Sequence, residues 1–176
     1  KDIRGFASFT YDDWHTRITQ LVSTGDLKTF PAGIEGNTPQ EKAVNYATAL
    51  TELVKSLYPT DEFAKRLSKD TSNAFKDAKT DLTTFFANNI DYDLKNNTIH
   101  KLFDKSNLTG ITNKDRLKKE LVAINLLSKI TDDYTQVSAL RLDGLDSATA
   151  LVNKYSPTWF SEKFAASMSP ETAAAI

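Results

Sequence analysis

The sequence predicts an all-α protein of about seven to nine helices, packed as an orthogonal or irregular bundle with no significant sheet. Helix start signals recur along the chain, where a Ser or Thr that can accept from a free backbone N–H precedes an acidic residue or a proline. Apolar residues at spacings of three and four follow most of these starts. Strand signals are weak, because the short apolar segments 98–103 and 139–142 have no hairpin turn beside them.

The first predicted helix begins at Thr10 and ends at Gly25. Its apolar positions are Trp14, Ile18, Leu21 and Val22. Residues 26–37 contain one proline and two glycines, and we expect them to form a surface loop. The second helix begins at Thr38 and is ended by Pro59. Its apolar stripe consists of Ala43, Tyr46, Ala47, Leu50, Leu53, Val54 and Leu57.

The middle of the chain carries two further helix signals and one irregular stretch. Thr60 can start a helix, and a later helix ends near Asn88 and Asn89. The apolar positions of that later helix are Ala78, Leu82, Phe85 and Phe86. Residues 91–109 are irregular. We expect a single helical domain over residues 1–176, and any division of the chain would fall within 91–109.

The last third of the chain contains helix starts at Thr112, Thr131, Ser156 and Ser169. Three apolar stripes lie among these starts and predict three or more helices. The stripes are Leu117, Leu121, Ile124, Leu127 and Ile130, then Leu145, Ala148, Leu151, Val152 and Tyr155, and then Phe160, Phe164 and Met168.

The composition argues against several classes of function. The 22 Lys and Arg residues are balanced by 23 Asp and Glu residues, so no net field favours nucleic acid or an anionic membrane. The absence of Cys removes disulfides, thiol nucleophiles and Cys-ligated metals. No apolar run approaches the roughly 18 residues of a membrane span. The first residue is Lys1, and Ala173–Ile176 resembles the start of another helix, so we expect a piece of a longer protein.

Residues that could carry catalysis are few, and each has a structural interpretation. His15 and His100 occur in no metal-ligand frame. The carboxylate pairs 12–13 and 132–133 lie in first helical turns, where capping and the helix dipole explain them. We therefore predict no catalytic residue, no metal site and no cofactor, and we expect the chain not to be an enzyme.

Three stretches resemble functional motifs, but none of them has the complete pattern. The sequence after Asp91 starts like a calcium loop, but Asn96 and Leu102 replace the required Gly and Glu. The stretch 33–38 lacks the Lys of a phosphate-binding loop. The basic cluster 114–119 includes an Asp and is best explained as a solvated helix face.

Aromatic residues are densest in two adjacent pairs, Phe85 with Phe86 and Trp159 with Phe160. Aromatic residues at helical spacing usually pack in the core. An exposed ring on each pair could instead anchor a neighbouring domain, so these four residues are the predicted interface.

Several segments together resemble the N-terminal helical region of A subunits of bacterial insecticidal toxin complexes. The first is Tyr11–Trp14, which is followed by the loop and by the run TPQEKAVNYATAL at 38–50 and LYPT at 57–60. The second covers 144–176, with GLDSATALV, Phe160 and SPETAAAI, and it is similar to the segment that these subunits share with the virulence-plasmid A protein family.

The resemblance implies a structural role. In such subunits the helical region forms part of an outer shell around a translocation channel in a large, secreted or cell-surface homo-oligomer. It implies that this chain contacts other domains of its parent protein. The balanced charge and the absence of a long apolar run lead us to expect that the chain binds no nucleic acid and does not itself insert into a membrane. None of the shared residues is catalytic.

Two other classes of function stay open. A helical adaptor could bind a peptide or protein partner in a groove between helices. An enzyme could use surface carboxylates, for instance on glycans, and would bring two of them to about 5 to 9 Å from one another in a deep pocket.

Overall fold

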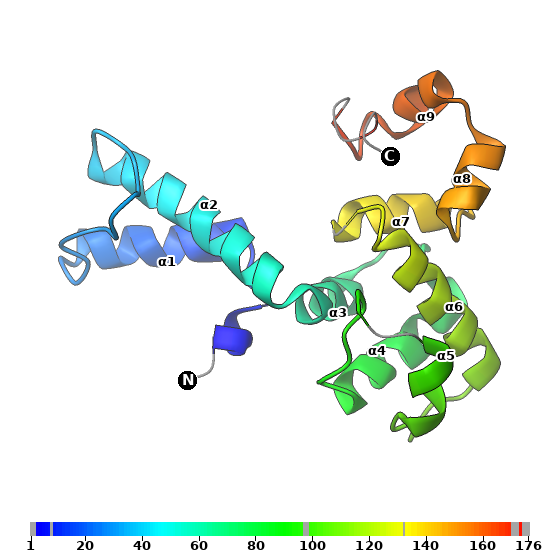
Figure 1. Cartoon of the computed structure of the whole chain (residues 1–176). Coiled ribbons are helices and arrows are strands. Elements are labelled where there is room, and N and C mark those ends of the chain that lie inside the picture. Colours follow the sequence, from blue (N-terminus) through cyan, green and yellow to red (C-terminus); the bar gives the residue numbers. More distant parts are fainter. Residues whose placement is uncertain (1–2, 8, 97–98, 132, 170–172, 174–176) are drawn as a thin grey trace. The chain divides into compact units, whose positions relative to one another are not determined.

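The structure is a computed structural model that describes residues 3–7, 9–96, 99–131, 133–169 and 173 (Figure 1). It is all-α, as the sequence predicted, and the described residues contain no strand. The α-helices are α1 (Tyr11–Ser23), α2 (Pro39–Leu57), α3 (Pro59–Lys69), α4 (Lys79–Asn88), the single-turn α5 (Ile99–Leu102), α6 (Lys114–Leu127), α7 (Tyr134–Leu142), α8 (Ala148–Lys154) and α9 (Pro157–Phe164). Short 3₁₀ helices are η1 (Ile3–Phe6), η2 (Lys76–Ala78) and η3 (Phe103–Lys105).

The chain forms two compact units, Lys1–Lys65 and Arg66–Ile176, which we call the N-terminal and the C-terminal unit. The division lies ahead of the stretch 91–109, where the sequence predicts any boundary. That stretch lies within the C-terminal unit, and it contains α5 and η3.

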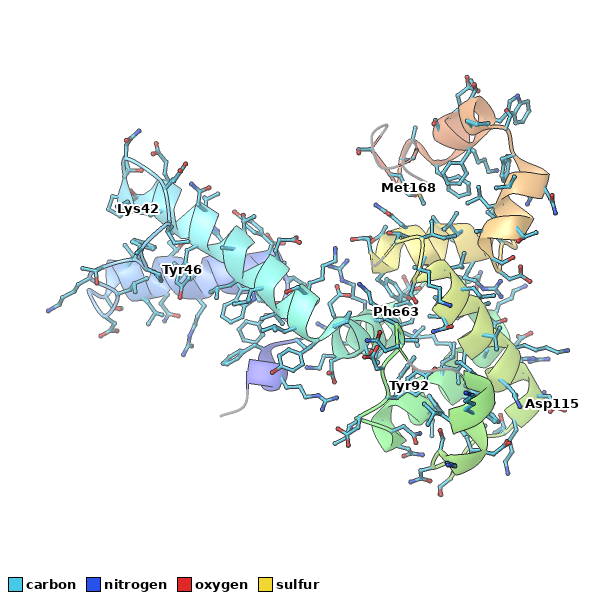
Figure 2. All side chains as sticks on the ribbon, in the orientation of Figure 1. Lys42, Tyr46, Phe63, Tyr92, Asp115 and Met168 are labelled. Carbon is cyan, nitrogen blue, oxygen red and sulfur yellow. The ribbon has the colours of Figure 1, made fainter. Side chains whose placement is uncertain are left out.

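The N-terminal unit is built on the packing of α1 against α2. Ile18 of α1 and the small residues Ala43 and Ala47 of α2 are buried, so the two helices approach closely. Partly buried side chains surround this cluster, namely Trp14, Val22, Leu27, Phe30, Tyr46 and Leu50. Tyr46, which Figure 2 labels, meets the ring of Phe30 edge to face at 6.1 Å.

The ends of α1 and α2 follow the predicted signals. Thr10 caps α1 in a full capping box, and Thr38 caps α2 ahead of the first-turn proline. Residues 26–37 form the expected loop. Gly36 is required there, because its φ is +137° and an added Cβ would lie 2.9 Å from the backbone nitrogen of Lys42.

The C-terminal unit has a larger apolar core, contributed mainly by α4, α6 and α7, with Leu67 from the end of α3. Its large, fully buried side chains are Leu67, Leu82, Phe85, Leu117, Leu121, Ile124, Leu127, Val137, Leu140 and Leu145. The predicted stripe of α6 is confirmed by four of these residues. The segment 139–142 lies within α7, as expected for a helix end.

The predicted apolar stripe of α2 extends beyond the part of its surface that α1 covers. Leu53 is 48% exposed and Leu57 is 53% exposed, although both were expected in the core. The physical reason is geometric: α1 covers the side of α2 that carries Ala43 and Ala47, and the two leucines lie at the edge of that side.

Candidate functional site

Three of the four aromatic residues predicted as an interface lie in the core. Phe85 is fully buried and Phe86 is 6% exposed, and both rings pack against Tyr92. Phe160 is 2% exposed. Their own unit covers these three rings, so the pair of Phe85 and Phe86 offers no exposed ring for a neighbouring domain. Trp159 is 67% exposed, and its role at an interface stays a prediction.

The candidate acids and base in the first turns take part in local structure. His15 is half-buried, and its ring stacks on Tyr11 with centroids 5.6 Å apart. The carboxylate of Asp13 accepts from the backbone N–H of Thr10 at 2.9 Å. Asp133 caps α7 by accepting from the first backbone N–H groups of that helix. These contacts agree with the capping interpretation.

Within the part of the chain that the structure describes, the other candidates form no assembled centre. Asp12 is exposed in the first turn of α1. Asp93 accepts from both the backbone N–H and the side-chain amide of Asn96, so it closes a turn. Asp132 and the side chain of His100 lie outside the described residues.

The basic cluster 114–119 is distributed around α6. Lys118 is half-buried, with its Nζ 5.3 Å from the centre of the Phe103 ring. Arg116 lies 3.6 Å from the carboxylate of Asp77, and both side chains are largely exposed. The cluster thus presents no continuous basic face.

One buried carboxylate joins α4 to the start of α6. Asp81, which is 2% exposed, accepts from the backbone N–H and hydroxyl of Thr112 and from the backbone N–H of Asn113 at 2.8 to 3.0 Å. Burial opposes ionisation of Asp81, but these hydrogen bonds outweigh it and lower its pKa. Asp81 therefore stays charged and holds the chain where α6 begins.

A second carboxylate joins the segment after α3 to α7. Asp70 accepts from the hydroxyl of Tyr134 at 2.5 Å and from the backbone N–H and hydroxyl of Ser72. Burial raises the pKa of Asp70, but these hydrogen bonds more than offset it, so the net shift is downward. Burial and the Asp70 carboxylate raise the pKa of Tyr134. The phenol is therefore held protonated, as a hydrogen-bond donor.

A third carboxylate joins the end of α7 to the end of α8. Asp143 accepts from the hydroxyl of Tyr155 at 2.5 Å and from the Nζ of Lys154 at 2.7 Å, while Lys163 of α9 lies 3.6 Å away. Burial raises the pKa of Asp143, but the hydrogen bonds from Lys154 and Tyr155 lower it by a larger amount. The net shift of the Asp143 pKa is therefore downward. We call Asp70, Asp81 and Asp143 the three clamp carboxylates.

A groove runs beside α6 on the face opposite to its core stripe. It has a volume of about 790 Å³, within the range of ligand pockets. Its apolar lining consists of Val122, Ala123 and Leu126, and Leu126 is 37% exposed. Its polar lining consists of Asp115, Lys118, Lys119, Glu120, Arg141, Asp146 and Ser147. We call this cavity the α6 groove.

An ion pair between helices forms part of the groove lining. One terminal nitrogen of Arg141 donates to both carboxylate oxygens of Glu120 at 2.8 Å, and the other donates to the carbonyl of Leu145 at 2.9 Å. The two charged side chains are 14% and 19% exposed. Such shielded, geometrically fixed pairs hold the elements that carry them in place.

Sequence reasoning missed the α6 groove. Val122 and Leu126 lie one turn apart, off the predicted core stripe of α6, and this second apolar pair was the available signal. The residues of the opposite side, Arg141 and Asp146, come from the end of α7 and the turn before α8. Their position depends on tertiary packing.

The described part of the chain lacks two kinds of feature. No group of three or more His, Asp or Glu side chains there is arranged to hold a metal ion. No helix there has both the length and the apolar character to cross a bilayer.

Comparisons with protein-family models, with curated proteins and with solved structures found no match. Function must therefore be inferred from the side chains themselves. The described features that bear on it are the clamp carboxylates, the exposed apolar residues and the α6 groove.

Proposed function

We propose that the chain is a non-catalytic α-helical structural domain that supports the assembly of a large translocation machine. It acts as a shell domain of a protein like the A subunits of insecticidal toxin complexes. Its partners are other domains of the parent chain and copies of that chain in a homo-oligomer. The site of action is secreted or at a cell surface. The resemblance at residues 38–60 and 144–176 supports this family assignment.

The observation that carries the proposal is that the carboxylates hold the fold together while large apolar side chains are left exposed. The clamp carboxylates accept hydrogen bonds that hold helices together. Large apolar residues are left exposed in both units, and they include Val44, Leu53, Leu57, Leu142, Val152 and Trp159. Single exposed apolar residues are ordinary, but Leu53 and Leu57 are one turn apart on α2 and form a small apolar ridge. Such a ridge suits contact with another protein surface.

Mass photometry of the full-length parent protein tests the assembly role. We expect Leu53→Glu with Leu57→Glu to shift the protein from a large oligomer toward smaller species, because two charges would enter the apolar contact. Thr48→Glu with Ala49→Glu adds the same charge at exposed positions of α2 and should leave the oligomer intact. A parent protein that is monomeric before any substitution would contradict the proposal.

A second candidate is supported by the α6 groove. A helical adaptor domain that binds a peptide or protein partner between helices needs an apolar surface with fixed polar groups beside it. The groove supplies both, in Val122 and Leu126 and in the paired Arg141 and Glu120.

A further inference from the structure

The α6 helix is apolar on two opposite sides. Leu117, Leu121 and Ile124 are fully buried in the core of the C-terminal unit. Val122 and Leu126 lie on the other side, where they line the α6 groove, and the buried Ala123 lies beside them. The residues of α6 that line the groove extend from Asp115 in the first turn (Figure 2) to Leu126. This is about 16 Å along the helix at 1.5 Å per residue.

The groove is held open by contacts that do not depend on an occupant. Arg141 is fixed by Glu120 and by the carbonyl of Leu145, so the side chains of α6 and α7 are tied together. Ser147 caps α8 and also donates to Asp146 at 3.1 Å. A pre-organised groove of this kind loses little conformational entropy when a partner binds.

The charges along the groove differ between its two sides. On the α6 side, Lys118 and Lys119 outnumber Asp115, and Glu120 is neutralised by Arg141. On the other side Asp146 is the remaining charge. Among the described residues, neither Lys119 nor Asp146 takes part in an ion pair. An occupant with acidic residues toward α6 would match this pattern.

We propose that the α6 groove binds an amphipathic helix of about three turns from a protein partner. The apolar stripe of that helix lies on Val122 and Leu126, and its acidic flank lies along Lys119. Apolar residues at spacings of three and four on the partner match a groove of this length and direction. The inference rests on the proposed role in protein contact and deepens its adaptor form.

Two synthetic 16-residue helical peptides serve as probes. Both carry leucines at helical spacing, and one has Glu on one flank where the other has Lys. We expect the acidic peptide to bind the full chain saturably in fluorescence anisotropy, at least fivefold more tightly than the basic peptide at low salt. Chemical-shift changes in NMR spectra should cluster at Lys119, Val122, Ala123, Leu126 and Asp146.

Matched variants locate the site. Leu126→Asp should abolish binding of the acidic peptide, and Lys119→Glu should weaken it about fivefold, the upper range for one exposed ion pair. The controls Leu142→Asp and Lys114→Glu make the same changes at exposed positions outside the groove and should bind normally.

Equal affinity for the two peptides, the absence of saturable binding, or normal binding by Leu126→Asp would each overturn the inference. Loss of this binding together with an intact oligomer of the parent protein would reject the groove alone. Normal peptide binding by a monomeric parent would reject the assembly role alone.

Discussion

The polar contacts that stabilise the two units differ in the sequence separation of the residues that they join. In the N-terminal unit the main polar contacts are local, such as the capping box of Thr10 with Asp13. In the C-terminal unit, Asp81 bonds to Thr112, 31 residues away in sequence. The N-terminal unit also has a part-buried long-range pair, Arg4 with Asp61, whose side chains are 29% and 23% exposed, and a buried carboxylate, Glu62.

The C-terminal unit is the one in which carboxylates accept several hydrogen bonds from segments distant in sequence. A buried carboxylate with several donors contributes more stability than an exposed one, because its removal leaves those donors unsatisfied. The N-terminal unit should therefore respond chiefly to changes in apolar packing and helix caps. The C-terminal unit should respond to packing and also to loss of its clamp carboxylates.

The largest effect is expected from Leu121→Asp. Leu121 is fully buried in the C-terminal unit, so the variant would place an unpaired charge in the core at a cost of about 4 kcal/mol or more. We expect a molten C-terminal unit, seen as lost near-ultraviolet circular dichroism. Leu142→Asp, at a residue that is 56% exposed, is the control. A normal melting profile for Leu121→Asp would contradict the core assignment.

A smaller effect is expected from Asp81→Asn. The amide keeps one acceptor oxygen but places an NH₂ group against the backbone N–H of either Thr112 or Asn113, at a cost of about 2 kcal/mol. Urea unfolding should show a lower midpoint with an unchanged slope. Asp77→Asn, at an exposed side chain, should leave the midpoint unchanged. Equal midpoints for the two variants would show that Asp81 is no clamp.

The smallest effect is expected from Thr38→Ala in the N-terminal unit. The Thr38 hydroxyl accepts from the backbone N–H of Glu41, and loss of this cap should cost about 1 kcal/mol. The change should be visible as faster hydrogen exchange in the first turn of α2. Thr48→Ala, at an exposed position within α2, is the matched substitution and should not speed that exchange.

The sequence separation of these contacts also explains which of them the sequence alone could predict. Thr10, Thr38 and Ser156 were predicted as helix starts, and the structure confirms all three caps. Each acts within three residues, so its signal is local. Thr112 was expected to cap α6, but Asn113 is the cap, because Asp81 binds Thr112 instead. No local pattern could reveal that partner.

The candidate sites were less predictable than the helices. Helical spacing correctly predicts that an aromatic residue lies on an apolar face, but it does not say whether a neighbouring element covers that face. Phe85 and Phe160 are covered and Trp159 is not. The α6 groove needs Arg141 and Asp146, which only the packing of α7 and α8 brings beside Val122.

The central claim is that the clamp carboxylates hold the structure and do not transfer protons. Hydrogen bonds lower the pKa of Asp70, Asp81 and Asp143 from the ordinary value of 3.8. For a carboxylate with a lowered folded-state pKa, the stabilisation is present above pH 3.8 and is lost as the pH falls through the lower, folded-state value.

An NMR titration of the three carboxyl carbons from pH 7 to pH 2, with amide exchange recorded in parallel, tests this claim most directly. We expect all three groups to titrate below pH 3.8, together with loss of amide protection in the C-terminal unit ahead of the packed residues of α1 and α2. Titration of any clamp carboxylate above pH 5 with the fold intact would contradict the account, because that side chain would then be poised for proton transfer.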